Sequence, residues 1–272
     1  MEYVKDLETP AVIVDLDIME KNLKHTAELA RNAGVKLRPH CKTHKSIWIA
    51  KKQLEYGAAG ITVAKLSEAE VMVNGGIDDI LVAYPIVGEK KLKRLEKLIK
   101  RASIIVCTDS VEVSQGLSDL GVSMGRKIKT YVQVNSGLQR CGREPGEETV
   151  ELVKSIIGLP GIEIIGLITH AGFSYDYVGE DSIRAAAHKE ADALLTTQKM
   201  LEKEGIEIKE ISVGSTPTSK FIGEMSGVTE VRPGAYVFGD DQQLSTGIIS
   251  EYECAMHILT TVVSTPREGS AI

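Results

Sequence analysis

The sequence predicts an α/β protein built as a (β/α)8 barrel. Short apolar runs alternate with longer helical patterns along most of the 272 residues. The strand cores are apolar on consecutive residues, which is typical of a parallel sheet covered by helices. Seven or eight such β-then-α units fit into about 230 residues, close to the usual size of this barrel. An open doubly wound sheet is the rival architecture, but it usually has fewer strands, and no GxGxxG motif follows the first apolar run.

The expected strands are the apolar runs that precede the helical patterns. They are Ala11–Asp15, Val35–Pro39, Gly60–Val63, Asp79–Ala83, Ser103–Thr108, Lys127–Asn135, Glu163–Thr169 and Glu207–Val213. Several of the expected helices stop at a glycine, the usual residue just past a helix C-terminus. These helices are Asp17–Asn32, Ser46–Glu55, Ser67–Asn74, Glu89–Arg101, Val111–Leu120, Gly146–Ile157 and Ile183–Glu204.

The pattern also predicts where the barrel ends. The alternation fades near Tyr236, and Ile248–Val263 resembles a strand rather than a helix. We therefore expect residues 1–245 to form the barrel. Residues 246–272 are expected to be the beginning of a C-terminal β-domain that is incomplete in this chain.

The composition excludes several classes of function. Lys and Arg number 32 and Asp and Glu 38, a net charge of −6, so the chain lacks the basic surface that nucleic acids or anionic membranes require. No apolar run approaches the roughly 18–20 residues that span a bilayer, and no secretion signal is recognised at the start. The four cysteines, Cys41, Cys107, Cys141 and Cys254, form no CxxC pair. We therefore expect reduced thiols in a cytoplasmic protein.

The densest cluster of functional groups follows the second expected strand. It is the octet Arg38-Pro39-His40-Cys41-Lys42-Thr43-His44-Lys45. Catalytic groups of a barrel lie at the C-terminal ends of its strands. A lysine crowded by other cations has a lowered pKa, which favours the neutral amine nucleophile. A lysine here is therefore a candidate for Schiff-base formation, although the residues alone are equally compatible with a solvated basic loop.

A second group follows the last expected strand. Gly214, Ser215 and Thr216 lead, through Pro217, into a helix expected over Ser219–Glu224. Glycine lets the backbone approach a ligand, and hydroxyls and free amides at a helix start bind phosphate. Phosphate sites after the last strands recur in this fold. The alternative is a capped helix start without a ligand.

Three further residues lie at or after strand ends. Arg140 could bind an anionic or phenolic oxygen, or form a surface salt bridge. His170 could stack on a flat cofactor or carry protons, or be a buried structural residue. Tyr236 could direct its hydroxyl at a phosphate, or lie in the core. The residues alone leave each pair of alternatives open.

Together these motifs resemble those of a known family. The octet is similar to the RPHxKTHK signature of D-threonine aldolases and eukaryotic-type D-serine dehydratases. These are fold-type III pyridoxal 5′-phosphate (PLP) enzymes, distant relatives of alanine racemase. The resemblance extends from about Thr9 to about Pro266, with supporting matches at Gly60–Ala64, Glu68–Glu70, Gly76–Pro85, Arg140–Gly142, Val213–Thr218 and Arg232–Phe238.

The resemblance implies roles for individual residues. Lys42 would form the Schiff base with PLP, and Arg140 would lie against the cofactor ring. The cofactor phosphate would be held by Gly214, Ser215 and Thr216, with Tyr236 nearby. His170 would sit beside the ring or the substrate, so Lys42 and His170 are the expected catalytic residues. The substrate would be a small amino acid, and the expected assembly is a homodimer.

The chain also departs from the family pattern. Gln133 and Asn135 replace the acidic residues expected before Arg140. Family members are longer, and their C-terminal β-domain carries a His-x-Cys or His-x-Asp pair that binds a divalent metal. That pair is not found in this sequence, so no metal ligands are predicted.

The leading functional prediction is a PLP-dependent D-threonine aldolase-like lyase, which splits D-β-hydroxy amino acids into glycine and an aldehyde. A D-serine or D-threonine dehydratase shares every motif used. The alternatives also include a PLP-binding barrel without turnover and an amino-acid racemase. A racemase needs a second acid or base on the opposite face of the ring.

Overall fold

The barrel strands meet in a single parallel sheet in the computed structural model, which describes residues 4–272. The order is β2-β9-β8-β7-β6-β5-β4-β3. The two ends of this order are joined, because Thr62 N donates to Pro39 O and Cys41 N donates to Thr62 O, both at 2.8 Å. The strands are β2 (Lys36–Leu37), β3 (Ile61–Val63), β4 (Asp79–Pro85), β5 (Ser103–Thr108), β6 (Ile128–Gln133), β7 (Ile162–Ile168), β8 (Glu210–Val213) and β9 (Glu230–Val231).

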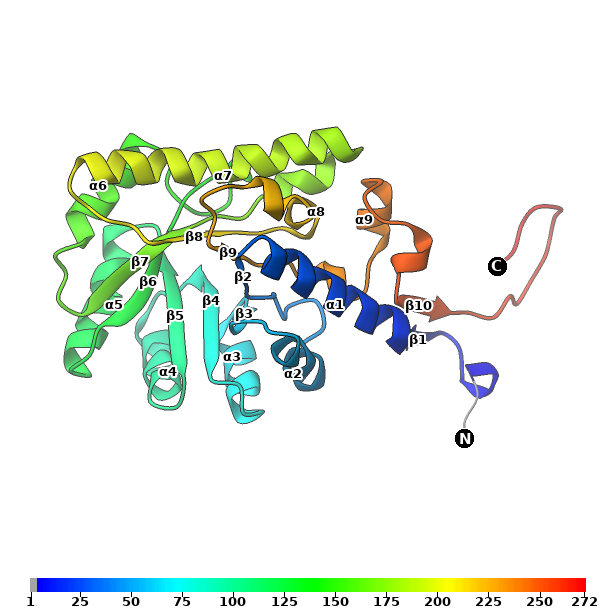
Figure 1. Ribbon diagram of the computed structural model, residues 1–272. Helices are drawn as coiled ribbons and strands as arrows, with labels where there is room; N and C mark the ends of the chain where they lie inside the picture. The colour runs from blue at the N-terminus through cyan, green and yellow to red at the C-terminus, as the bar shows by residue number, and fades with distance from the viewer. Residues whose placement is uncertain (1–3) are drawn as a thin grey trace.

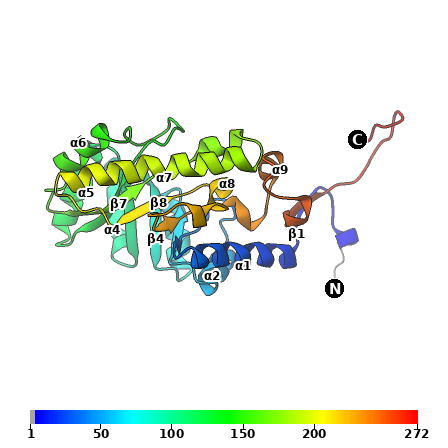
Figure 2. The ribbon, with the colours of Figure 1, turned by 45° about the horizontal axis from the view of Figure 1, so that its top comes forward.

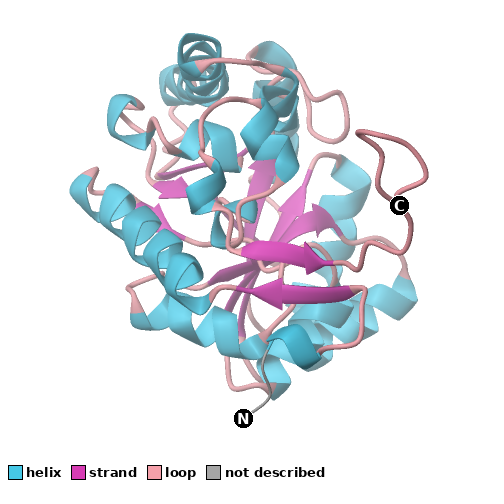
Figure 3. Cartoon of the chain, turned by 90° about the vertical axis from the view of Figure 1, so that its right-hand side faces the viewer, coloured by secondary structure: helices cyan, strands magenta, loops and turns pink. Residues whose placement is uncertain are grey.

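Helices lie around the outside of these strands (Figures 1 and 3). They are α1 (Leu16–Asn32), α2 (Ile47–Glu55), α3 (Leu66–Asn74), α4 (Glu89–Ile99), α5 (Val111–Ser123), α6 (Glu147–Ile156), α7 (Glu180–Lys203), α8 (Thr216–Ser219) and α9 (Asp241–Ser245). Side-chain caps start several of them: Ser46 Oγ accepts from the amide of Ile49 at 3.3 Å, and Ser110 Oγ from that of Val113 at 3.2 Å. No helix within residues 4–272 is long and apolar enough to cross a membrane.

The first and last strands differ from the sequence prediction. The first apolar run does form a strand, β1 (Ala11–Val14), but it lies outside the barrel and pairs antiparallel with β10 (Met256–Leu259). The eighth barrel strand is instead β9, which the prediction missed. Glu230 and Val231 lie between Thr229 and Arg232, so this segment has no apolar run of the kind that predicts a buried strand.

The chain after the barrel is mostly irregular. Of the segment Ile248–Val263, expected to be strand-like, only β10 is a strand, and the short 3-10 helix η5 (Glu251–Glu253) precedes it. The β1–β10 pair lies at one end of the molecule, away from the barrel sheet (Figures 1 and 2). The strand-like pattern expected over Ile248–Val263 is therefore found only at Met256–Leu259.

A polar chain runs through the inside of the barrel. Arg38 Nε donates to Glu230 Oε2 at 2.7 Å, and Ser212 Oγ donates to Glu230 Oε1 at 2.6 Å. Arg232 in turn donates to Ser212 Oγ at 2.5 Å. Glycine is needed at position 60, because a Cβ there would lie 2.7 Å from the backbone carbonyl oxygen of Asp79 and would also contact the guanidinium of Arg38. This chain connects the cavity at one end of the barrel with the pocket at the other.

Candidate active site

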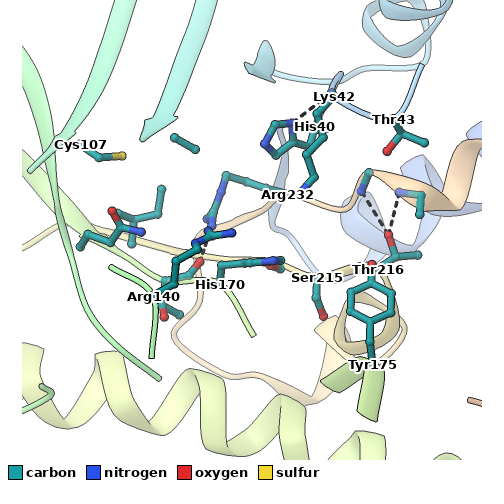
Figure 4. A pocket seen from close by; sticks show the side chains of 17 residues that line it. His40, Lys42, Thr43, Cys107, Arg140, His170, Tyr175, Ser215, Thr216 and Arg232 are labelled. Atoms are coloured by element: carbon teal, nitrogen blue, oxygen red, sulfur yellow. Dashed lines mark hydrogen bonds between the residues drawn. The ribbon is translucent and has the colours of Figure 1, made fainter. Parts of the chain in front are cut away.

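A pocket opens at the C-terminal ends of the barrel strands (Figure 4). It encloses about 620 Å³ of empty space, its mouth included, which is in the range of small-molecule sites. Its lining includes six of the seven residues for which the sequence predicts a role: Lys42, Arg140, His170, Gly214, Ser215 and Thr216. These residues follow β2, β6, β7 and β8, so closure of the barrel brings together segments that are far apart in the sequence.

Lys42 lies in the turn after β2, at the mouth of the pocket. Lys45 N donates to Cys41 O at 2.8 Å, and Lys45 Nζ donates to Lys42 O at 3.1 Å. Partial burial lowers the pKa of Lys42, and the nearby guanidinium of Arg140 lowers it further. A lowered pKa was expected from the neighbouring cations of the octet, but in the structure one of the cations responsible is Arg140, which comes from another loop. The shift increases the fraction of neutral amine.

Arg140 lies on the loop between β6 and α6, which two side chains shape. Asn135 Oδ1 accepts from the amide of Gln139 at 3.1 Å, and Asp109 Oδ2 accepts from the amide of Gly142 at 3.1 Å. Gln139 adopts a left-handed φ of +56°, which a non-glycine residue rarely does. The loop is thus held at both ends and carries Arg140 to the pocket (Figure 4).

Two imidazoles line the pocket, with opposite nitrogens protonated. His170 Nδ1 is hydrogen-bonded to the Gly214 carbonyl. Because a carbonyl can only accept, Nδ1 carries the proton and Nε2 is left without one. His40 Nδ1 accepts from the amide of Lys42 at 3.2 Å, so its Nε2 carries the proton (Figure 4). Burial lowers the pKa of both rings, that of His170 to about 4, so both are neutral at pH 7.

The loop after β8 leads directly into α8. Ser215 caps this helix, because its Oγ accepts from the amide of Thr218 at 3.3 Å. Thr216 Oγ1 accepts from the amide of Gly234 at 3.2 Å, which ties the loop to the one after β9. The expectation of a helix over Ser219–Glu224 was wrong: α8 covers Thr216–Ser219, and only the short 3-10 helix η3 (Ile222–Glu224) lies in the expected range. Pro217 has no amide proton and the Thr218 amide donates to Ser215 Oγ, so the amides of Ser215 and Thr216 are the ones that an anion could use here.

Arg232 is a site residue to which the sequence argument assigned no role. It is buried at the inner side of the pocket, where it donates to Val213 O at 2.9 Å and to the Thr169 carbonyl. Burial lowers its pKa, and the charge of Glu230 acts in the opposite direction. An arginine remains protonated in proteins, so Arg232 is a permanent cation next to the ligand space.

Tyr236 does not line this pocket. It is buried, and its hydroxyl accepts from Gln53 Nε2 at 3.0 Å. Tyr175 lies beside Thr216 instead, on the short 3-10 helix η2 (Gly172–Asp176) (Figure 4). Tyr175 follows His170 by five residues in the sequence, which was the available sign that it could reach the site. An irregular loop, however, has no periodicity that indicates where a side chain points.

The balance of charge in the pocket indicates the class of ligand. Of the described residues that line it, Lys42, Arg140 and Arg232 are cationic, and none carries a carboxylate. Such a set of donors suits an anionic ligand, because the cations attract it and no carboxylate in this lining repels it. Within residues 4–272, no group of three or more His, Cys, Asp or Glu residues is placed to hold a metal ion.

Comparison with known proteins gives the family. The family model described as alanine racemase, N-terminal domain, matches residues 14–242. The chain belongs to this family. Alanine racemase of Clostridium difficile, at 21% identity and a TM-score of 0.74, shares the fold. Other relatives are more similar in sequence and in structure, and they are named as aldolases and dehydratases of the kind that the octet resembles.

Those relatives cover nearly all of the chain. D-threo-3-hydroxyaspartate dehydratase of Delftia sp. is 32% identical over 260 residues, which are 94% of this chain and 68% of that protein. D-threonine aldolase of Arthrobacter sp. is 32% identical over 269 residues, 98% of this chain and 71% of that protein. The crystal structure of D-threonine aldolase from Filomicrobium marinum is 34% identical with a TM-score of 0.91, over 98% of this chain and 73% of that one. The resemblance found in the sequence is therefore confirmed.

The alanine racemase-like family implies PLP as its cofactor. The residues of the pocket fit this group. PLP needs an amine to bond to its aldehyde and donors for its phosphate and its phenolic oxygen. Lys42 offers an amine of lowered pKa, and Arg140, Arg232 and the start of α8 offer donors.

Proposed function

We propose that this chain is a PLP-dependent lyase that cleaves D-β-hydroxy amino acids, in the manner of a D-threonine aldolase. The observation that carries the proposal is a pocket at the C-terminal ends of the barrel strands, in which Lys42, with its lowered pKa, lies close to other cations and no described lining residue is acidic. That arrangement suits an anionic cofactor bonded to an amine. The choice of reaction is supported by the relatives named D-threonine aldolase and 3-hydroxy-D-aspartate aldolase.

Different residues of this chain would bind different parts of the cofactor. Lys42 would hold the aldehyde carbon and Arg140 the phenolic side of the ring. The loop of Gly214, Ser215 and Thr216 would hold the phosphate, with the amides of Ser215 and Thr216 as donors, because the Gly214 amide donates to Glu190. When bound, PLP serves as the electron sink for the bond broken at the substrate α-carbon. Arg232, which is fixed by Ser212 and Val213, holds a positive charge beside this space.

The two histidines would handle protons and hydrogen bonds around the substrate. Cleavage of the Cα–Cβ bond turns the β-hydroxyl into an aldehyde carbonyl, so its proton must leave. His170 Nε2 is unprotonated and can accept this proton. His40 Nε2 carries a proton and can donate a hydrogen bond to a substrate oxygen. These opposite protonation states follow from backbone contacts that exist before any ligand binds.

Dehydration of the same substrates is the second candidate. It is favoured by the Delftia relative, which is named a dehydratase and is as similar to this chain as the Arthrobacter aldolase. In that reaction, the Cα proton and the β-hydroxyl leave. The products separate the two: D-threonine gives glycine and acetaldehyde by the first route, and 2-oxobutanoate and ammonia by the second.

The visible absorption spectrum with added PLP is the primary test. We expect a yellow band in the parent and in Lys65→Ala, a control for an exposed lysine in the loop after β3, and its loss in Lys42→Ala. Product analysis with D-threonine then follows. A band retained in Lys42→Ala, or no band in the parent, would contradict the assignment of cofactor and lysine. A band without any product would indicate a binding protein instead.

We also propose that the protein works in the cytoplasm as a homodimer with an active site near the interface. The four cysteines, all free, support a reducing compartment. The family resemblance supports the dimer. Light scattering during size-exclusion chromatography measures the mass of the assembly, and a monomer at micromolar concentration would contradict this part of the proposal.

A further inference from the structure

Glu190 joins the two loops that carry His170 and Gly214. It lies on α7, completely buried behind the pocket rather than in its lining. Its Oε1 accepts from the amides of Ala171 at 3.0 Å and Gly214 at 2.8 Å. Its Oε2 accepts from Thr218 Oγ1 at 2.9 Å. All three partners donate, so this carboxylate acts purely as an acceptor.

The hydrogen bonds of Glu190 surround the hydrogen bond between His170 and Gly214. Ala171 directly follows His170 in the chain, and the Gly214 carbonyl is the group to which His170 Nδ1 donates. A single oxygen of Glu190 therefore holds the backbone on both sides of the His170–Gly214 hydrogen bond. The loop has little freedom on its other side, because a Cβ at Gly214 would lie 3.0 Å from the backbone nitrogen of Arg232.

We propose that Glu190 is a positioning residue that selects the tautomer of His170. By holding Ala171 and Gly214, it keeps the Gly214 carbonyl opposite Nδ1, so that the proton stays on Nδ1 and Nε2 is free towards the pocket. The catalytic meaning rests on the proposed function, in which Nε2 accepts the substrate proton. The tautomer itself exists in the chain without any ligand, so it can be measured separately.

The geometry suggests variants that separate position from charge. In Glu190→Gln, the amide oxygen can accept from both backbone amides and the NH2 can donate to Thr218 Oγ1. The Thr218 proton can then turn to Ser215 Oγ, 2.9 Å away. In Glu190→Asp, the charge remains, but the side chain is shorter by one bond, about 1.5 Å, and cannot reach both amides. Glu190→Ala removes the acceptor altogether.

The test is the tautomer of His170 in the cofactor-free protein at pH 7, measured by two-bond ¹⁵N–¹H correlation on histidine-labelled samples. The His170 signals are assigned by their loss in His170→Gln. We expect the Nδ1–H tautomer in the parent, in Glu190→Gln and in Asp192→Ala, a control at an exposed position on the same helix. We expect loss of most of the Nδ1–H signal in Glu190→Asp and Glu190→Ala.

Two results would overturn the proposal. One is a parent-like Nδ1–H signal in Glu190→Asp or Glu190→Ala. The other is a mixture of tautomers in Glu190→Gln, since that variant keeps the acceptor contacts to both backbone amides. This result decides the question even where circular dichroism shows that the other two variants do not fold. Failure of the cofactor band in the parent would reject the proposed function but leave the tautomer result intact.

Discussion

The two ends of the barrel use charged side chains in opposite ways. At the N-terminal end, the charges are paired: Lys36 lies 2.6 Å from Glu210, and Arg38 lies 2.7 Å from Glu230 and also contacts Asp79. At the C-terminal end, the lining described for the pocket holds three cations and no carboxylate. Paired charges satisfy one another, whereas unpaired cations are available to a ligand. The comparison places stability at one end of the barrel and binding at the other, as is usual for this fold.

The largest effect is expected when the buried pair at the N-terminal end is broken. Arg38→Ala leaves the buried Glu230 carboxylate without its partner. Removing one member of such a pair costs about 3–5 kcal/mol. We expect the free energy of unfolding, measured in urea, to fall by this amount, with Lys209→Ala, at an exposed position, as the control. A loss below about 1 kcal/mol would mean that these charges do not stabilise the barrel.

Arg140→Ala tests the opposite end. Arg140 is exposed and pairs with no carboxylate among the described residues, so we expect the stability of the cofactor-free protein to stay nearly unchanged. A hydrogen bond to a charged group contributes about 1.5–3 kcal/mol. PLP affinity, measured by titration of the visible band, should therefore fall about tenfold to a hundredfold. A large loss of stability with unchanged PLP affinity would show that Arg140 stabilises the fold and does not bind the cofactor, which contradicts the prediction.

The pH dependence of stability sharpens the contrast at His170. Its pKa is about 4 in the folded chain, below the ordinary value of 6.5, because the ring is buried. The unfolded chain therefore binds more protons between about pH 4 and 6.5, and stability falls as the pH falls through this window. His44, also with a pKa of about 4, adds to the same slope. We expect His170→Gln to make the slope of unfolding free energy against pH shallower; an unchanged slope would contradict the buried neutral ring.

The smallest effect is expected at Lys36. Its pair with Glu210 is at the N-terminal end but remains half-exposed. Exposed ion pairs contribute about 0–1 kcal/mol and are screened by salt. Lys36→Ala should lower the unfolding free energy by no more than this, and less in high salt. A loss as large as that of Arg38→Ala would show that exposure does not separate the two pairs.

Much of the fold was predictable because it depends on local patterns. The strand Ser103–Thr108 agrees with the prediction at both ends, and α1, α2 and α3 each agree within a residue. Their apolar runs and stop signals lie within the segment itself. β9 could not be predicted, since its two residues become a strand only when β2 and β8 offer partners on both sides. The antiparallel pairing of β1 with β10 joins residues at the two ends of the chain, which no local pattern can indicate.

The candidate site shows the same division. The octet and the run of Gly214, Ser215 and Thr216 were visible because many polar groups stand together after an apolar run. Arg232 and Glu190 were not assigned roles, because each is a single charged residue whose importance comes from burial. Tyr175 lines the pocket beside Thr216 whereas Tyr236 does not, since the direction of a side chain in an irregular loop is decided by packing.

The sequence by itself determined the class of fold, the family and the amine-bearing loop, because these follow from the order of apolar and polar residues along the chain. Only the tertiary structure decided which charges remain free. Arg38 and Lys42 belong to one octet, yet Arg38 lines the cavity at the N-terminal end, paired with Glu230, while Lys42 lines the pocket at the other. The physical reason is that burial and pairing depend on neighbours from distant strands, which meet only when the barrel closes.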